Sequence, residues 1–265
     1  MKIGFLITAR LKSQRLPLKI IKELNGKKVI EHIIERAKQI DNINEIVLCT
    51  SSNHQDEPLI SLAEKMNISY FLGDEEDVLK RLNDASKLYK LDYFIGITAD
   101  NPLFSIYHSN IISNIIQNAD YDFIKIIGLP LGSATYGMNV KALRTICSIK
   151  KIIDTEIWGI FIDRPDIFDI LTIEADSEYN RPHYRLTLDY KEDYQMLNHL
   201  YSKIPYENTL SLINVIEYLD NNPDVAEINK NCIQQDLDGR IKKRIDNDFN
   251  ENKSKILEIK NNFYK

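Results

Sequence analysis

The sequence predicts an α/β protein in which a mainly parallel sheet is covered by helices on both faces, in three layers. Short apolar runs alternate along the chain with stretches in which apolar residues recur every three or four positions. The runs are continuous, which is typical of strands buried on both faces, and strand–helix alternation favours parallel pairing. Strands are therefore expected at residues 3–8, 45–50, 68–72, 93–98 and 121–127.

The segments between these strands have the helical period and predict helices. After the third strand, Gly73 is followed by Asp74, Glu75 and Glu76, a composition that favours the first turn of a helix. The expected helices lie within residues 27–40, 57–66, 75–89 and 108–119.

The regular alternation ends near residue 128. Residues 128–139 are rich in turn-forming residues and predict an irregular loop. Beyond Pro205 the chain becomes polar and rich in asparagine and lysine, so we expect one domain over residues 1–205 and a helical extension over 206–265. Between the loop at 128–139 and Pro205, we expect helices at 140–149, 155–162 and 191–204, and strands at 168–175 and 184–190.

Composition excludes several classes of protein. The net charge of −5 disfavours extended nucleic-acid binding, which needs a basic face. Cys49, Cys147 and Cys232 form no C-x-x-C pair, so neither a disulfide framework nor a cysteine zinc site is expected, and a reducing compartment, the cytoplasm, fits best. No segment approaches the ~18 apolar residues of a membrane span, so no membrane association is expected.

The stretch ARLKSQRLPLK at residues 9–19, which we call the phosphate loop, follows the first predicted strand. The nine glycines form neither G-x-G-x-x-G nor G-x-x-x-x-G-K-[ST], so a bound nucleotide would have to be held by side chains and loop amides. Arg10, Arg15 and Lys19 could surround phosphate oxygens, and Ser13 could bind a remaining one. The alternative is a surface loop with incidental charge.

Two acidic residues follow predicted strands. Asp100 ends the fourth strand in ITADNP, and Asp189 ends the segment YRLTLDY. In open parallel sheets ligands bind beyond the carboxyl ends of the strands, and Mg²⁺ is often held by one or two carboxylates together with phosphates. We therefore expect Asp100 and Asp189 to form a sparse Mg²⁺ site, with Asp193 capping the helix that follows.

Taken together, these segments resemble the cytidylyltransferase family that makes CMP-activated sugars. That family includes the CMP-Kdo and CMP-sialic acid synthetases, and the resemblance is strongest to the spore-coat polysaccharide biosynthesis protein F branch. It spans residues 1–204 in matching order, including ITARLKSQRLPLK, FLGDEEDVLKRL, ITADNPL and YRLTLDYKEDYQML. It implies a nucleotide-diphospho-sugar transferase fold, which is glycosyltransferase-A-like, with a C-terminal helical extension.

The resemblance also implies roles for individual residues. CTP would lie on the phosphate loop, Arg10, Arg15 and Lys19 would hold its triphosphate, and Asp100 and Asp189 would hold Mg²⁺. Arg10, Lys19 and Asp100 are the residues assigned to catalysis. The other nucleotide-binding candidates are Ala9, Ser13, Thr50, Ser51 and Arg81. Arg81 could instead pair with the acids that precede it on a helix.

The acceptor side departs from the family. Relatives commonly read R-x-G-S-x-R-L-P-G-K, whereas this chain has Lys12 and Leu18 at the two glycine positions. Their R-G-x-D segment is LGSATYGMN here, and their R-E-H-V segment is TEIW. The acceptor-binding candidates are Tyr136, Asn139, Glu156, His183 and Arg185. The first two are also common loop residues, and His183 could be a surface residue.

The sequence thus predicts a cytoplasmic, homodimeric enzyme that transfers CMP from CTP to a sugar or sugar-like acceptor. Trp158 is expected in the core or at a dimer interface. Nonulosonic acids, Kdo-like sugars and phosphorylated or phosphonate molecules all remain open as acceptors. Two other classes remain as alternatives. A glycosyltransferase would normally need a D-x-D motif at a strand end, and the D-x-D motif at 246–248 lies in the charged tail. A non-catalytic nucleotide-binding relative is the other.

Overall fold

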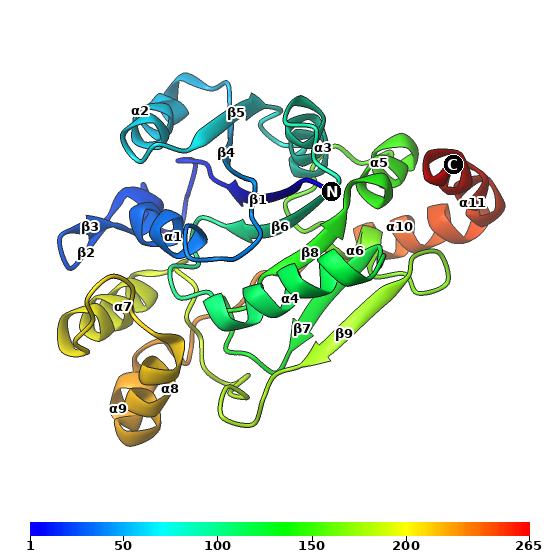
Figure 1. The fold of residues 1–265 in the computed structure, drawn as a ribbon. Coiled ribbons are helices and arrows are strands. Elements are labelled where there is room, and N and C mark those ends of the chain that lie inside the picture. Colours follow the sequence, from blue (N-terminus) through cyan, green and yellow to red (C-terminus); the bar gives the residue numbers. More distant parts are fainter.

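A seven-stranded sheet forms the centre of the protein, and the computed structural model describes all 265 residues (Figure 1). The strand order is β5-β4-β1-β6-β8-β7-β9, and every neighbouring pair is parallel except the two pairs that include β8. The predicted mainly parallel α/β fold is confirmed. The strands are β1 (Ile3–Thr8), β4 (Glu45–Ser51), β5 (Ser69–Gly73), β6 (Tyr93–Thr98), β7 (Phe123–Ile127), β8 (Tyr136–Asn139) and β9 (Ile170–Glu174).

Helices cover both faces of this sheet. The longer ones are α1 (Val29–Ala37), α2 (Glu57–Lys65), α3 (Val78–Leu88), α4 (Ile106–Asn118), α5 (Val140–Ile149), α7 (Lys191–Lys203), α8 (Leu212–Asn221), α10 (Gly239–Glu251) and α11 (Lys253–Tyr264). Short elements complete the chain: the hairpin β2 (Glu23–Leu24) and β3 (Lys27–Lys28), helices α6 (Gly159–Ile162) and α9 (Pro223–Ala226), and 3₁₀ turns η1 (Lys19–Ile21), η2 (His54–Asp56) and η3 (Glu227–Asn229). None of the helices is long and apolar enough to cross a membrane.

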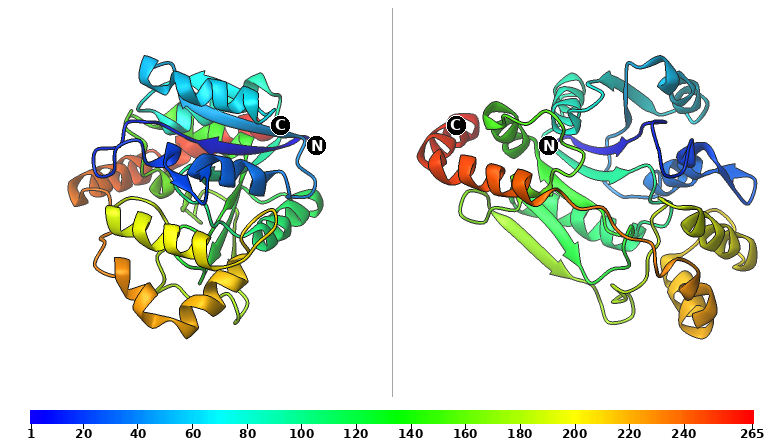
Figure 2. Two further views of the ribbon diagram at one scale, coloured as in Figure 1. Left: turned by 90° about the vertical axis from the view of Figure 1, so that its left-hand side faces the viewer. Right: turned by 180° about the vertical axis from the view of Figure 1, so that it is seen from behind.

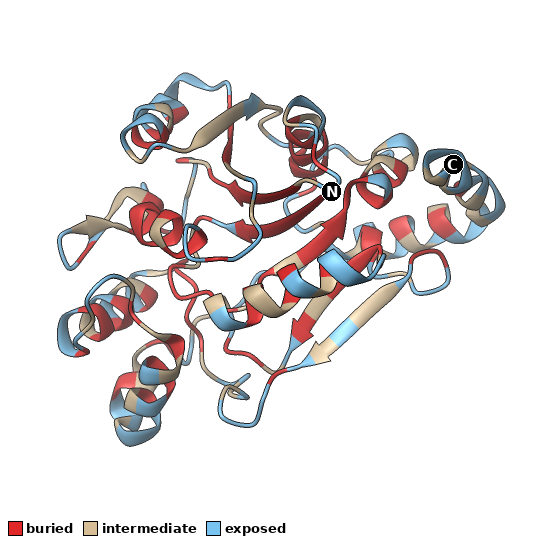
Figure 3. Ribbon diagram, viewed as in Figure 1, coloured by how far each residue is buried: buried red, intermediate tan, exposed pale blue.

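The core is divided by the sheet. On β1, Phe5 and Ile7 belong to one apolar cluster and Leu6 belongs to the other, because successive side chains point to opposite faces. The first cluster includes α1, α4, α7 and α8, and the second includes α3, α5, α6 and α10. Figure 3 shows the central strands mostly buried, whereas most covering helices other than α1 have an exposed side. This burial explains why the predicted strands are continuous apolar runs.

Several local predictions were wrong. The segment 128–139 is not a loop throughout, because residues 136–139 form β8 between β6 and β7. The segment 184–190 is extended but makes only one isolated bridge, between Leu131 and Arg185, so it is not a strand. The predicted helix at 155–162 is reduced to α6. Whether a segment pairs as a strand depends on tertiary contacts, which local composition does not encode.

The C-terminal extension packs against both faces of the sheet. Val215 and Leu219 of α8 lie in the first apolar cluster, and Ile245 and Phe249 of α10 lie in the second. Residues 230–238, which we call the connecting segment, join these two parts. Figure 2 (right) shows the connecting segment in orange, running in extended form from the α8–α9 side to α10. The domain boundary at 205 stays a prediction.

Candidate active site

The carboxyl ends of β1 and β6 position the two central segments of the candidate site. The strands are parallel and in register, with Thr8 opposite Thr98. The backbone N–H of Ala99 donates to the carbonyl of Thr8 at 2.9 Å, so the phosphate loop and the turn that contains Asp100 leave the sheet side by side. The N–H of Leu188 donates to the carbonyl of Asp100 at 2.9 Å and brings the segment with Asp189 to the same place.

Four of the predicted residues meet at this edge. Lys19 Nζ donates to Asp100 Oδ2 at 2.5 Å and to Asp189 Oδ1 at 2.8 Å. Arg15 Nη2 donates to the same oxygen of Asp189 at 3.0 Å. Two phosphate-loop cations are therefore paired with two carboxylates that lie far from them in the sequence.

These pairs set the charge of the site. Burial alone would raise the pKa of Asp189, but the charges and hydrogen bonds of Lys19, and the charges of Arg15 and Arg185, outweigh burial and lower it. Burial alone would lower the pKa of Lys19, but the charges and hydrogen bonds of Asp100 and Asp189 outweigh burial and raise this pKa. At pH values above the ordinary aspartate pKa of about 3.9, ionised Asp189 thus stabilises the fold. This contribution is lost as the pH falls through the lowered pKa of Asp189 in the folded protein.

Arg185 lies behind Asp189. Its Nη2 donates to Asp189 Oδ2 at 3.0 Å, and its Nε donates to Asp193 Oδ1 at 2.9 Å. Asp193 is fully buried and also accepts the backbone N–H groups of Asp189 and Tyr190, which confirms it as the cap of α7. The placement of Arg185 on the acceptor side is corrected, because its guanidinium is 7% exposed and is engaged with these carboxylates. Arg185 orients Asp189.

Arg10 lies at the other end of the site. Its guanidinium donates to the carbonyl of Glu75 and forms an ion pair with Glu156. Lys12 Nζ contacts Glu75 Oε1 at 3.0 Å. Glu156 therefore lies beside the phosphate loop, where it pairs with the first arginine of the predicted triphosphate site.

Asp56 fixes the phosphate loop and is a residue that sequence reasoning missed. This buried carboxylate accepts the backbone N–H of Leu11 at 2.7 Å and the hydroxyl of Ser51 at 2.6 Å. Ser51, a predicted nucleotide ligand, is thus turned towards Asp56. A buried acid beside the N-terminus of a helix has no distinctive sequence signal, because Asp56 also looks like an ordinary cap residue.

The remaining nucleotide-binding candidates surround this loop. Arg81 is 1% exposed and donates to the carbonyls of Asp74 and Glu75, so it supports the backbone that Arg10 contacts. Thr50 is buried, and its hydroxyl has no hydrogen-bond partner. The N–H of Ala9 donates to the carbonyl of Cys49, and Ser13 Oγ accepts the N–H of Leu16 at 3.4 Å. Their roles towards a nucleotide stay predictions.

The acceptor candidates do not gather in one place. Tyr136 lies opposite Gly96 in the carboxyl half of β6, in edge contact with Trp158 at 4.6 Å between ring centroids. Burial raises the pKa of Tyr136, so its phenol is protonated at neutral pH. His183 is exposed and contacts Tyr184.

The prediction for Asn139 is wrong. Because β8 is antiparallel to β6, Asn139 lies opposite Tyr93, at the start of β6 and about 17 Å from the strand's other end. Its amide donates to the Tyr93 hydroxyl at 2.9 Å and to Asp120 at 3.0 Å, and its side-chain oxygen accepts the N–H of Lys141 at the start of α5. Asn139 is a helix cap on the opposite edge of the sheet.

Leu18 stands where relatives have glycine and adopts the left-handed conformation that glycine favours. Its φ is 55° and its ψ is 27°, and its side chain is 49% exposed. Lys12, at the other glycine position, does not have a positive φ. The phosphate loop therefore keeps the left-handed backbone at position 18 although it has lost the glycine, and this conformation costs a leucine about 1 kcal/mol.

Replacing Leu18 by glycine or alanine tests this conformation. The Leu18→Gly variant should be more stable than Leu18→Ala by about 1 kcal/mol, because only alanine keeps the strain of the left-handed backbone. Both variants lose the same exposed side chain, so packing cancels in the comparison. Urea unfolding measures the difference, and an alanine variant as stable as the glycine variant would show that position 18 is not held left-handed in solution.

The two carboxylates fit a divalent cation. Asp100 and Asp189 present one oxygen each to the same ammonium nitrogen, so a single cation already lies between them. Asp100 Oδ1 also accepts the hydroxyl of Thr98 at 2.5 Å, which fixes the carboxylate. No three histidine, cysteine or acidic side chains gather into a metal cluster in the chain. A pair of carboxylates without a third protein ligand is the donor set that Mg²⁺ takes when phosphates complete its shell.

The D-x-D motif of the tail does not form such a site. Asp246 and Asp248 lie on α10, where Asp246 pairs with Arg164 at 2.6 Å and Asp248 pairs with Lys151 at 2.8 Å. This motif therefore gives no support to a nucleotide-sugar-dependent glycosyltransferase.

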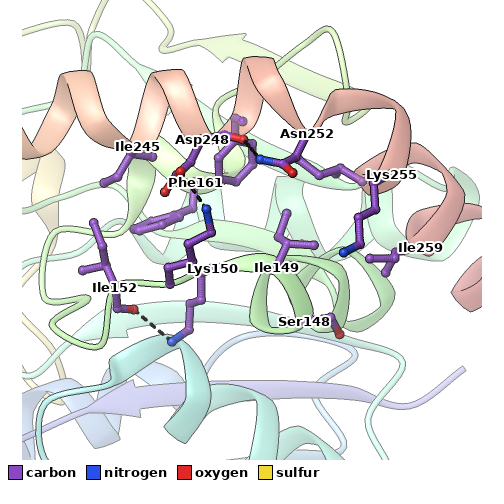
Figure 4. A pocket seen from close by; sticks show the side chains of 13 residues that line it. Ser148, Ile149, Lys150, Ile152, Phe161, Ile245, Asp248, Asn252, Lys255 and Ile259 are labelled. Carbon is purple, nitrogen blue, oxygen red and sulfur yellow. Dashed lines mark hydrogen bonds and ion pairs between the residues drawn. The ribbon is translucent and has the colours of Figure 1, made fainter.

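A cavity of about 120 Å³ lies outside the candidate site. It is bounded by the end of α5 and by α10 and α11, and Figure 4 shows Ile149 and Ile245 on its walls. Lys150 reaches out of it to the carbonyl of Ile152 at 3.2 Å. None of the predicted nucleotide, acceptor or metal residues lines this cavity.

Comparison with known proteins agrees with this geometry. The sequence pattern of the family described as cytidylyltransferase matches residues 5–214. The chain belongs to the cytidylyltransferase family. It is therefore a nucleotidyltransferase, and the predicted family membership is confirmed. The match includes the phosphate loop, Asp100 and Asp189, and it ends within α8, before the connecting segment.

Relatives of this cytidylyltransferase extend over most of the chain. The spore coat polysaccharide biosynthesis protein SpsF of Bacillus subtilis is 30% identical over 233 residues, which cover 84% of this chain and 96% of SpsF. A cytidylyltransferase structure from Leptospira borgpetersenii has a TM-score of 0.78 at 24% identity, covering 89% of this chain and all of that one. The structure of CMP:2-keto-3-deoxy-manno-octonic acid synthetase complexed with CTP has a TM-score of 0.60 at 15% identity, covering 77% and 99%. The last two show the shared nucleotide-diphospho-sugar transferase fold.

Proposed function

We propose that this cytidylyltransferase transfers CMP from CTP to a sugar or sugar-acid-like acceptor, releases pyrophosphate, uses Mg²⁺, and acts in surface polysaccharide or glycan synthesis. The observation that supports this best is the meeting of Lys19 and Arg15 with Asp100 and Asp189 at the carboxyl edge of the sheet. Cations for phosphates and carboxylates for a metal are both needed in phosphoryl transfer, and here they are adjacent. The relation to SpsF, a spore coat polysaccharide biosynthesis protein, and to the CMP:2-keto-3-deoxy-manno-octonic acid synthetase supports the acceptor class and the pathway.

In the proposed reaction, an acceptor hydroxyl attacks the α-phosphorus of CTP. A new P–O bond forms to the acceptor, and the bond from the α-phosphorus to the bridging oxygen breaks. The electron pair of that bond leaves with pyrophosphate, and the acceptor proton passes to solvent. Arg10, Arg15 and Lys19 hold the triphosphate and stabilise the charge that develops on the leaving group. Placing both reactants in one orientation supplies much of the remaining rate.

Binding of the triphosphate requires the present ion pairs to rearrange. Arg10 must turn from Glu156, and Arg15 and Lys19 must turn from Asp189, before their charges can be given to phosphate. Asp100 and Asp189 are the residues that would hold Mg²⁺, which supplies charge neutralisation at the phosphates. The same rearrangement therefore frees the two carboxylates for Mg²⁺ and frees the basic side chains for the nucleotide.

The acceptor assignment rests on fewer observations. Tyr136 lies towards the carboxyl half of β6, opposite Gly96, and we keep it as a candidate for contact with a sugar hydroxyl. Glu156 would be free to contact an acceptor once Arg10 binds phosphate. We keep His183 as a candidate because it is exposed two residues from Arg185.

Pyrophosphate release tests the proposed function. Purified protein with CTP and Mg²⁺ should release pyrophosphate only when a suitable acceptor is present, in a panel of nonulosonic acids, Kdo-like sugars and phosphorylated small molecules. ATP and GTP in place of CTP serve as controls, and a chelator should stop the reaction. Binding of CTP without turnover on any acceptor would instead support a non-catalytic nucleotide-binding protein.

A further inference from the structure

The connecting segment and the turn before it lie next to the candidate active site, on the side of Arg185 and Asp193. This part of the chain, residues 229–238, lies beyond residues 5–214, which match the family. It runs in extended form between the α8–α9 side and α10 (Figure 2). Its side chains contact the residues that orient Asp189.

Gln234 completes the surroundings of Arg185. The Nε and Nη2 of this guanidinium are bonded to Asp193 and Asp189, as described above. The remaining nitrogen, Nη1, donates to Gln234 Oε1 at 3.0 Å. Every nitrogen of the guanidinium therefore has a hydrogen-bond partner, and the partner of Nη1 comes from the connecting segment.

Asn229, at the end of η3, also contacts Arg185 and Asp193. It is buried, and its Nδ2 donates to the carbonyl of Arg185 and to Asp193 Oδ1, both at 2.9 Å. Nearby, the hydroxyl of Tyr190 donates to the carbonyl of Ile233 at 3.1 Å. The C-terminal part thus bonds to residues on both sides of Asp189 in the sequence.

We propose that Gln234 and Asn229 are positioning residues of the active site. By fixing Arg185 and Asp193, they fix the orientation in which Asp189 faces Lys19 and the proposed cation. Residues that hydrogen-bond to the neighbours of a metal ligand commonly fix the geometry of that ligand, and their loss lowers metal affinity or activity. The inference rests on the proposed function, because it concerns the same carboxylate, and it gives the C-terminal extension a part in the site.

Gln234 is the better residue to test, because its side chain is mostly exposed and packs in no apolar cluster. In Gln234→Ala, we expect Mn²⁺ to bind about ten-fold more weakly in the presence of a CTP analogue with a methylene group between its α- and β-phosphates, measured by electron paramagnetic resonance. We expect kcat to fall by a similar factor, while KM for CTP changes less than about three-fold. Gln234→Glu keeps an acceptor oxygen for Arg185 and should restore Mn²⁺ affinity.

The adjacent Gln235 provides the matched control. It is exposed and makes no side-chain hydrogen bond, so Gln235→Ala should match the wild type in Mn²⁺ affinity. A Gln234→Ala protein with wild-type Mn²⁺ affinity would overturn this inference alone, as would a loss that parallels a lower urea midpoint. A wild-type protein that binds neither Mn²⁺ nor the CTP analogue would overturn the proposed function, and the inference with it.

Discussion

Replacing Asp100 by asparagine is expected to lower kcat by about 10³-fold or more. The carboxylate is one of the two that face Lys19, and the amide would keep its size while removing the charge that the proposed cation needs. The N–H of Leu188 bonds to the backbone carbonyl of Asp100, which the substitution leaves in place, so the fold should persist. Turnover is measured as pyrophosphate release, and Mn²⁺ binding is measured alongside it.

Asp41→Asn is the matched control for Asp100→Asn. Asp41 is an exposed aspartate whose side chain makes no hydrogen bond or ion pair, and it lies before β4, away from the carboxyl edge of the sheet. It should leave kcat unchanged. If Asp100→Asn retained a tenth or more of the wild-type kcat, the assignment of Asp100 to the cation would be wrong.

The sheet could be predicted because its strands are buried on both faces. The segments that became β1, β4, β6 and β7 are continuous apolar runs, and local composition alone marks them. The antiparallel β8 could not be predicted in this way. It is only four residues long and includes Gly137, where an added Cβ would lie 2.8 Å from Ile112 of α4. A glycine required by close helix packing looks like a turn residue in the sequence.

The charged centre of the site was also predictable, whereas its support was not. Asp100 follows β6 and the phosphate loop with Lys19 follows β1, and parallel strands bring such positions to one edge. Asp189 ends another apolar segment, which reaches this edge through the bond from the N–H of Leu188 to the carbonyl of Asp100. Arg185 was assigned to the acceptor side because nothing in its own segment indicates that Asp193 and Gln234 would enclose it. Contacts across 49 residues of sequence depend on how the C-terminal extension packs, which no local pattern encodes.

Replacing Lys19 by methionine should change two measurements in opposite directions. We expect kcat to fall by about 10²-fold, because the ammonium no longer stabilises charge on the leaving pyrophosphate. In the absence of nucleotide, we expect Mn²⁺ to bind about ten-fold more tightly, because the cation that now lies between Asp100 and Asp189 is gone. Titration with Mn²⁺, with and without a CTP analogue, measures the second effect.

Lys12→Met separates these effects from a general loss of positive charge. Lys12 belongs to the same loop, but it is exposed and pairs only with Glu75, so it should alter nucleotide-free Mn²⁺ binding little. The pKa of Asp189 should rise in Lys19→Met, because burial still raises it while the charge of Lys19 no longer lowers it. The gain in Mn²⁺ affinity should therefore be largest at neutral pH and should shrink on acidification.

The two Lys19 measurements together distinguish a metal site from a purely structural ion cluster. In a structural cluster, removing Lys19 would leave two uncompensated carboxylates, and stability would fall without any gain in metal binding. In the proposed enzyme, the same two carboxylates are needed for the cation, and Lys19 occupies their shared position until phosphate draws it away. Unchanged nucleotide-free Mn²⁺ binding in Lys19→Met would therefore contradict the idea that one location serves the lysine and the metal in turn.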